Sequence, residues 1–278
     1  MVQLEEVPFV FESCGRKLYG VFNLGENKKI ILFLHGWGTY RIGPHQIFVH
    51  AARHFQKLGY SSLRFDFSGR GESEGDYHSM SLIDMIQDVK AAVTSLESRL
   101  DVEEIILVGM CSGGEVAVAA AQFSEKIKKV ILWSSPFLAR QFLDKQDNSE
   151  RKHYLYTYWK KLFNRESWMK LLKGQIQWGI IAKVLSKKKA VNLKSESKNE
   201  VDYLNDFKGY RGSVLLIYGT KDPIAQVSEK DYSELMKEHK INYQIYWIEG
   251  ANHNFYSKAW KRDVIERSEI FLTKKSVH

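Results

Sequence analysis

Cysteine and proline are scarce in this chain of 278 residues, which contains two cysteines and four prolines. Two thiols, Cys14 and Cys111, are too few for a disulfide framework or a zinc–thiolate site, so any thiol chemistry is expected to be catalytic. The few prolines, together with only 19 glycines, exclude a collagen-like or proline-rich chain. With 44% hydrophobic and 27% charged residues, the composition predicts a globular protein with one sizeable core.

Long hydrophobic runs are also missing. No run of apolar residues approaches the ~18 that a membrane-spanning helix requires. The stretch from Met1 to Glu6 is acidic, whereas a secretory signal peptide begins with basic and then apolar residues. We therefore expect a cytoplasmic protein.

Positive charge is concentrated in one segment of the chain, whose formal net charge is +8. Residues 138–212 hold 17 Lys and Arg against 8 Asp and Glu, whereas the remainder holds 24 basic and 25 acidic residues. This segment shows no strand pattern, and the stretch 170–189 carries an apolar helical face formed by Leu172, Ile176, Ile180 and Val184. We therefore predict a helical lid at 138–212, inserted between core segments 1–137 and 213–278.

Two interpretations of the basic lid stay open. Its lysines are either a solvated surface above an apolar face that packs on the body, or a contact for an anionic carrier, cofactor or membrane. Nucleic acid is not expected, because no recognition module accompanies the charge. The aromatic residues of the segment are expected to pack the lid or to line an acyl pocket: Tyr154, Tyr156, Tyr158, Trp159, Phe163, Trp168 and Trp178.

Outside the lid, short β-branched runs alternate with amphipathic stretches, which predicts an α/β fold: a mostly parallel central sheet flanked by helices. Residues 9–11 and 17–22 flank a Ser13-Cys14-Gly15 turn and predict an antiparallel hairpin. Runs without clean alternation predict parallel strands buried on both faces at 30–34, 62–65, 105–108, 130–133, 214–218 and 243–248. Apolar spacings of three and four residues predict helices at about 45–58, 80–98, 112–123, 228–239 and 257–272.

A glycine-flanked thiol follows the predicted strand at 105–108, in Gly109-Met110-Cys111-Ser112-Gly113-Gly114, and a helical run comes next. Strand, tight turn and helix form a nucleophile elbow, in which the residues two before and two after the nucleophile crowd each other. Glycine relieves this crowding. Both positions are glycine, Gly109 and Gly113, if Cys111 is the nucleophile, whereas Ser112 would place Met110 at the first of them. Cys111 is therefore the preferred nucleophile, and Ser112 is the alternative.

A carboxylate and an imidazole follow the last two predicted strands. Asp222 lies in the loop after 214–218, and His253 lies in the loop after 243–248. Each is weak evidence alone, because Asp222 before a proline could cap a turn and His253 could be an ordinary loop histidine. Together with Cys111, at three strand ends, they predict a catalytic triad. The helix N-terminus and a neighbouring imidazole would lower the pKa of the thiol.

Acyl transfer also needs hydrogen-bond donors that face the developing oxyanion. His35-Gly36-Trp37-Gly38 directly follows the strand at 30–34, and its glycines allow the backbone to turn so that the Trp37 N–H faces the site. The second predicted donor is the N–H of Ser112, which follows the nucleophile.

On these motifs the chain resembles α/β-hydrolase-fold proteins over essentially its whole length, with nucleophile, acid and base in the order of that family. Asp66-Phe67-Ser68-Gly69-Arg70-Gly71-Glu72-Ser73 is similar to the Asp-x-x-Gly-x-Gly-x-Ser loop that shapes the pocket rim in the family. Cysteine at the nucleophile position is shared with dienelactone-hydrolase-like enzymes. Together with Tyr40-Arg41-Ile42-Gly43-Pro44-His45, the motifs also resemble exosortase-associated hydrolases of bacteria.

We therefore expect an ester or thioester hydrolase that forms an acyl-enzyme, with two alternatives: an acyltransferase using the same acyl-enzyme, and a non-catalytic binding protein of this fold. The expected partner is a small acyl ester or thioester, including a donor linked to a carrier or coenzyme A that a basic lid would attract. No cofactor is implied. His50 and His54 have the spacing of metal ligands on a helix, but no third ligand is evident, so no metal site is predicted.

Overall fold

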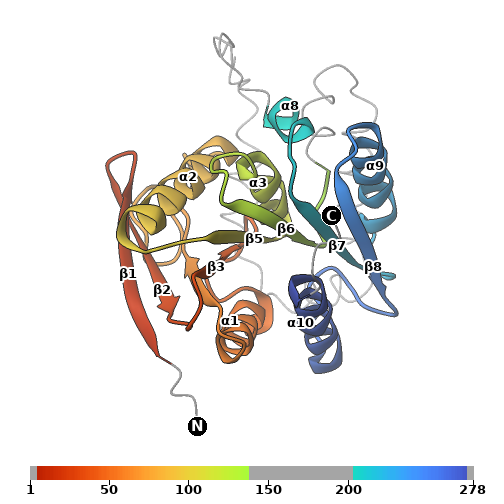
Figure 1. Cartoon of the computed structure of the whole chain (residues 1–278), viewed down its shortest axis with the longest axis horizontal. Helices are drawn as coiled ribbons and strands as arrows, with labels where there is room; N and C mark the ends of the chain where they lie inside the picture. The colour runs from red at the N-terminus through yellow and green to blue at the C-terminus, as the bar shows by residue number, and fades with distance from the viewer. Residues whose placement is uncertain (1–4, 138–202, 274–278) are drawn as a thin grey trace, which may run out of the picture. The chain divides into compact units, whose positions relative to one another are not determined.

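The computed structural model describes residues 5–137 and 203–273, which form an eight-stranded sheet with helices on both faces (Figure 1). The predicted lid helix at 170–189 and the aromatic residues of the predicted lid lie outside the described residues.

The sheet begins with an antiparallel hairpin, in which β1 (Glu6–Ser13) pairs with β2 (Arg16–Asn23). Six further strands run parallel to one another: β3 (Lys29–Leu34), β4 (Ser61–Phe65), β5 (Glu104–Met110), β6 (Ile127–Trp133), β7 (Ser213–Gly219) and β8 (Asn242–Ile248). Their order across the sheet is β1-β2-β4-β3-β5-β6-β7-β8, with β2 antiparallel to β4. The predicted hairpin and all six predicted parallel strands are confirmed.

Helices cover both faces of the sheet. One face carries α1 (Ile47–Lys57), which follows the 3-10 turn η1 (Pro44–Gln46), and α10 (Lys258–Thr273) (Figure 1). The other face carries α2 (Leu82–Arg99), α3 (Ser112–Ala120), α8 (Tyr203–Lys208) and α9 (Ala225–Glu238). The five predicted helices are confirmed, with ends displaced by at most three residues. None of the helices within residues 5–137 and 203–273 is long and apolar enough to cross a bilayer.

The face covered by α1 and α10 holds an apolar core. Phe48 and Phe55 of α1 pack in this core, and Trp133 at the end of β6 lies 5.9 Å from Phe48 between ring centroids. The indole N–H of Trp133 donates to the hydroxyl of Ser268 on α10 at 3.1 Å, so the buried polar group has a partner. Alternate residues of four parallel strands point into the same core: Ile31, Phe33, Ile106, Val108, Ile131, Leu215 and Ile217.

Helix α8 lies within the range predicted to be the lid, in a part for which no individual helix is predicted. It packs against α3, and the rings of Phe207 and Tyr210 are buried and stacked, 5.6 Å between centroids. Residues 203–212 therefore belong to the same compact unit as the sheet, and the rest of the predicted lid lies outside the described residues.

The parallel strands end together at one edge of the sheet. Leu34 at the end of β3 is in register with Gly109 of β5, and Gly109 is in register with Leu132 of β6. Gly219 at the end of β7 is in register with Ile248 of β8. The loops that follow β3, β5, β7 and β8 therefore emerge at the same edge, where the candidate site lies.

Candidate active site

Cys111 lies at the apex of a strained turn between β5 and α3. Its backbone angles are φ 54° and ψ −133°, and a positive φ is uncommon for a residue other than glycine. Ser112 follows as the first residue of α3, so the thiol lies at the positive end of that helix. The Cys111 N–H donates to the carbonyl oxygen of Trp133 at 3.0 Å, which attaches the turn to β6.

Glycine is required at both flanking positions, but the two glycines have different neighbours. A Cβ at Gly109 would lie 2.3 Å from the carbonyl oxygen of Gly113, which is the crowding across the turn that the sequence analysis expects. A Cβ at Gly113 would lie 2.1 Å from the carbonyl oxygen of Leu34 on β3. Gly113 therefore allows the start of α3 to approach the neighbouring strand.

His253 and Asp222 come together from two different loops. The Nδ1 atom of His253 lies 2.9 Å from Oδ2 of Asp222. The other carboxylate oxygen, Oδ1, accepts the Ile224 N–H at 3.2 Å, so the acid is held by its own loop. An imidazole that donates from Nδ1 keeps Nε2 as its proton acceptor, which is the tautomer that a general base for a thiol requires.

Cys111 and His253 change each other's pKa. Burial raises the pKa of the Cys111 thiol, but the hydrogen bond and charge of His253 outweigh burial, and the net pKa is lowered. Burial lowers the pKa of His253, but the hydrogen bonds to Asp222 and Cys111 outweigh it and raise the pKa to about 10. Both shifts favour a thiolate paired with an imidazolium over a neutral pair.

The loop after β3 packs directly on the nucleophile turn. A Cβ at Gly36 would lie 3.1 Å from the Cβ of Cys111 and 3.6 Å from its sulfur. The next backbone N–H, that of Trp37, donates to the hydroxyl oxygen of Ser112 at 2.7 Å. The Ser112 backbone and hydroxyl both lower the pKa of the Cys111 thiol. The two amides expected to form the oxyanion hole therefore lie beside the thiol, with the Ser112 hydroxyl on the Trp37 N–H.

Arg70 supports this loop from the Asp66–Ser73 loop, a role that the sequence analysis did not assign. Its Nε donates to the Trp37 carbonyl oxygen at 2.9 Å. Its guanidinium carbon lies 4.3 Å from the centroid of the Trp37 ring and 4.8 Å from that of Tyr77, so the cation lies between two aromatic rings. Arg70 and Trp37 are 33 residues apart in the sequence, and no motif spacing relates them.

His35 also fastens the loop, and its role is structural. The ring is fully buried; Nδ1 donates to the Gly36 carbonyl oxygen at 2.9 Å, and Nε2 accepts the Phe67 N–H at 3.2 Å. Burial lowers the pKa of His35 to about 4. The imidazole is therefore neutral at pH 7 and links the loops after β3 and β4.

A buried acid close to Cys111 was also not predicted from the sequence. Glu115 lies on α3, one turn after Cys111, and is fully buried. Burial, and to a smaller extent the charge of Cys111, raise the pKa of Glu115 to about 8. A protonated Glu115 adds no second negative charge near the thiolate. The signal was available in the sequence, since Glu115 begins an otherwise apolar run, Val116 to Ala121.

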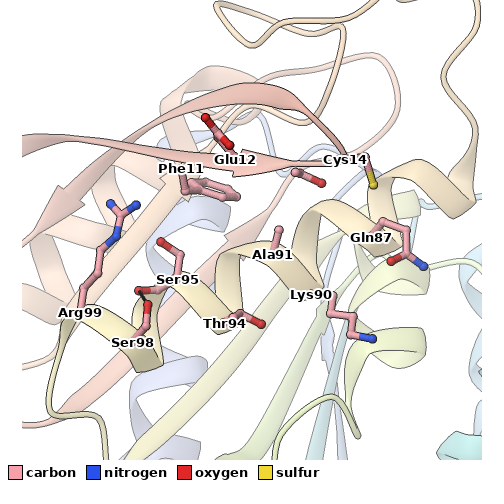
Figure 2. A pocket seen from close by; sticks show the side chains of 11 residues that line it. Phe11, Glu12, Cys14, Gln87, Lys90, Ala91, Thr94, Ser95, Ser98 and Arg99 are labelled. Atoms are coloured by element: carbon pink, nitrogen blue, oxygen red, sulfur yellow. Dashed lines mark hydrogen bonds between the residues drawn. The ribbon is translucent and has the colours of Figure 1, made fainter.

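The remaining candidates lie away from these residues. His54 pairs with Glu269 of α10, with Nε2 and Oε2 2.7 Å apart. Within residues 5–137 and 203–273, no group of three or more His, Cys, Asp and Glu is placed to hold a metal ion. A pocket of about 470 Å³ lies between β1 and α2, with Cys14 near one end and Arg99 near the other (Figure 2). Its lining includes none of the proposed triad or oxyanion-hole residues.

Comparison with known proteins agrees with this fold. A family model described as the alpha/beta hydrolase fold matches residues 29–150. The chain is 35% identical to thiohydrolase aneE of Aspergillus aculeatus over 121 residues. This match covers 42% of this chain and 37% of that protein. It is 30% identical over 117 residues to the AB hydrolase superfamily protein YisY of Bacillus subtilis, covering 41% and 40%. The matches thus span less than half the length of these curated relatives.

Solved structures extend the likeness over nearly the whole chain. The Pyrococcus furiosus esterase Pf2001 superposes with a TM-score of 0.66 at 20% identity, covering 97% of this chain and 90% of that one. Est1E from Butyrivibrio proteoclasticus, solved with ferulic acid, gives a TM-score of 0.62 at 17% identity, covering 96% and 100%. The chain therefore has the α/β-hydrolase fold, as its motifs led us to expect.

Proposed function

We propose that this protein hydrolyses an ester or thioester, with Cys111 as nucleophile, His253 as general base and Asp222 as the acid that orients it. The proposal is carried by one observation: His253, held by Asp222, and a thiol at the N-terminus of α3 shift each other's pKa toward an ion pair. Two similar proteins, a thiohydrolase in sequence and an esterase in fold, support this class of reaction.

The first half-reaction acylates the thiol. The thiolate of Cys111 attacks the substrate carbonyl carbon, a C–S bond forms, and the carbonyl π electrons move to oxygen. The N–H groups of Trp37 and Ser112 stabilise the resulting oxyanion. When the carbonyl re-forms, the bond to the leaving alkoxide or thiolate breaks, and the His253 imidazolium gives this group its proton.

The second half-reaction releases the acyl group. Neutral His253 takes a proton from water, and the hydroxide attacks the thioester carbon. Collapse of this second tetrahedral intermediate expels Cys111 as a thiolate and forms the free acid. The excess of positive charge at 138–212 makes an acyl donor on an anionic carrier or on coenzyme A a candidate substrate.

Intact-mass measurement after incubation with p-nitrophenyl esters and acyl-coenzyme A thioesters of several chain lengths tests the proposal. We expect one added acyl group on the unaltered protein and on the matched control Cys14→Ala, and none on Cys111→Ala. Release of free acid supports hydrolysis, whereas acyl transfer only to an added alcohol or thiol would make the protein an acyltransferase. Acylation that survives Cys111→Ala but is lost in Ser112→Ala would move the nucleophile to Ser112. Absence of an adduct and of turnover with every donor would favour a binding protein.

A further inference from the structure

The hydroxyl of Ser112 is bonded to a backbone N–H that the proposed reaction needs for the substrate oxygen. Donors of an oxyanion hole lie about 2.7–3.1 Å from the oxyanion. The Trp37 nitrogen lies 2.7 Å from the Ser112 Oγ, so one of the two expected donors is already bonded to an oxygen atom of this chain. A substrate oxygen can bind the Trp37 N–H only if it takes the place of this hydroxyl oxygen or shares the N–H with it.

The single proton of this hydroxyl is directed elsewhere. Because Oγ accepts the Trp37 N–H, its own proton is available for a second acceptor, and the Ser112 side chain lowers the pKa of the adjacent Cys111 thiol. The Ser112 hydroxyl, bonded to the Trp37 N–H, can therefore direct its proton toward the thiolate. The oxyanion loop and the nucleophile are joined by one side chain.

A hydroxyl proton directed at the sulfur stabilises the thiolate but not the tetrahedral intermediate that forms after it attacks. When the thiolate attacks, the sulfur enters a C–S bond and loses its negative charge, while the carbonyl oxygen gains one. A hydroxyl proton follows such a shift by rotation about the Cβ–Oγ bond, without movement of the backbone. The amide proton of Ser112 has no such freedom, because helix α3 fixes its direction.

We infer that the Ser112 hydroxyl is a third and mobile donor of the oxyanion hole, which donates to the Cys111 thiolate in the free protein and to the oxyanion in the tetrahedral intermediate. The inference rests on the proposed function, since it needs Cys111 to be acylated. It gives Ser112 a catalytic role other than that of an alternative nucleophile.

Two measurements on Ser112→Ala test separately whether the hydroxyl donates to the thiolate and whether it donates to the oxyanion. His253 also acts on the thiol, and it remains in this variant. The rate of iodoacetamide alkylation against pH reports the thiolate of the free protein. The single-turnover acylation rate with p-nitrophenyl acetate, measured at a pH where the thiol of both proteins is ionised, reports the intermediate. Both are measured with Cys14→Ser as the parent, so that one thiol reacts.

We expect the pH midpoint of alkylation to be higher in Ser112→Ala than in the parent. Its plateau acylation rate should fall roughly 10²-fold, the lower end of the rate loss for removal of one oxyanion donor. Ser112→Thr keeps the hydroxyl and should restore most of both. If only the midpoint changes, the hydroxyl serves the thiolate alone; if acylation becomes faster, it merely blocks the hole; if neither quantity changes, it has no role. Each of these results overturns the inference.

Failure of the proposed function gives a different pattern. The parent protein would then not be acylated, or would be acylated equally after Cys111→Ala. Ser112→Gly provides a second variant without the hydroxyl if Ser112→Ala does not fold, and thermal unfolding of each variant checks that the fold is intact.

Discussion

The carboxylate of Asp222 binds the imidazole of His253 across two loops, with Oδ2 2.9 Å from Nδ1. The Asp222 side chain is completely buried, whereas 26% of the His253 side chain is exposed. The charge that orients the base is thus shielded from water, and the base itself stays accessible.

Replacing Asp222 by asparagine should slow the reaction while leaving substrate binding nearly unchanged. Asparagine has the same shape but no charge, so it no longer stabilises the imidazolium that forms on His253. We expect kcat for a p-nitrophenyl ester to fall roughly 10²–10⁴-fold, the range of one general acid–base group, with little change in KM. Because the two residues act as a unit, the variant with both Asp222→Asn and His253→Ala should be little slower than His253→Ala. Additive losses, or full activity of Asp222→Asn, would contradict the pairing.

The Cys111 thiol should react with iodoacetamide at a lower pH than an ordinary thiol does. Its pKa is lowered, so the thiolate is present above that value and is lost only as the pH falls through it. In His253→Ala the Cys111 thiol stays buried but loses the imidazole that offsets the effect of burial. The midpoint of its alkylation against pH should therefore move above about 8.5. The measurement is an alkylation rate from pH 4 to 10, with Cys14→Ser as the parent. Identical midpoints in the two proteins would remove His253 as the group that activates the thiol.

Gly109→Ala should destabilise the fold, whereas Gly38→Ala should not. A Cβ at Gly109 would lie 2.3 Å from a backbone oxygen, which no side-chain movement can relieve, but a Cβ at Gly38 meets no atom within 4 Å. We expect a loss of at least ~1–3 kcal/mol in the free energy of unfolding for Gly109→Ala, the usual cost of overpacking. Denaturant unfolding of both variants provides the comparison. Equal stabilities would mean that the turn is not as tight as described.

The neutral state of His35 should make the protein sensitive to acid. Its pKa is lowered from the ordinary 6.5 to about 4 in the folded state, so the unfolded state binds more protons between these values. The stabilisation is complete above pH 6.5 and is lost as the pH falls toward 4, by about 3 kcal/mol for this shift. His35→Gln should be less stable at pH 7 and should show a flatter dependence of unfolding free energy on pH. Titration of the His35 ring near pH 6.5, followed by NMR, would refute this account.

The sheet and the elbow could be predicted from local sequence, because their causes are local. Strands buried on both faces need continuous apolar runs, and the turn at Cys111 needs glycine on each side. The contacts of Trp37 could not be predicted in the same way. Its N–H meets Ser112, 75 residues away, and its carbonyl meets Arg70, 33 residues away. Both contacts depend on which loops the strand order brings together.

The short helix α8 was missed for a related reason. It has six residues, too few for an amphipathic repeat to be visible, and it is held by packing against α3 rather than by its own helical propensity. Glu115 was visible as a charge in an apolar run, but its closeness to the thiol follows from the position of Cys111 one helical turn before it.

Cys111 lies more than 100 residues before Asp222 and His253 in the sequence, so it is synthesised before them. This order has a consequence for the nascent chain. Domains generally fold from the N-terminal side as the ribosome releases them. Strand β5 and Cys111 emerge early, whereas β7 and β8, which carry Asp222 and His253 in the loops that follow them, emerge last of the strands. Until then the thiol lacks the imidazole of His253 and the carboxylate of Asp222, so the nascent chain carries a cysteine with an ordinary pKa. The lowered pKa of Cys111 arises only when the sheet is complete.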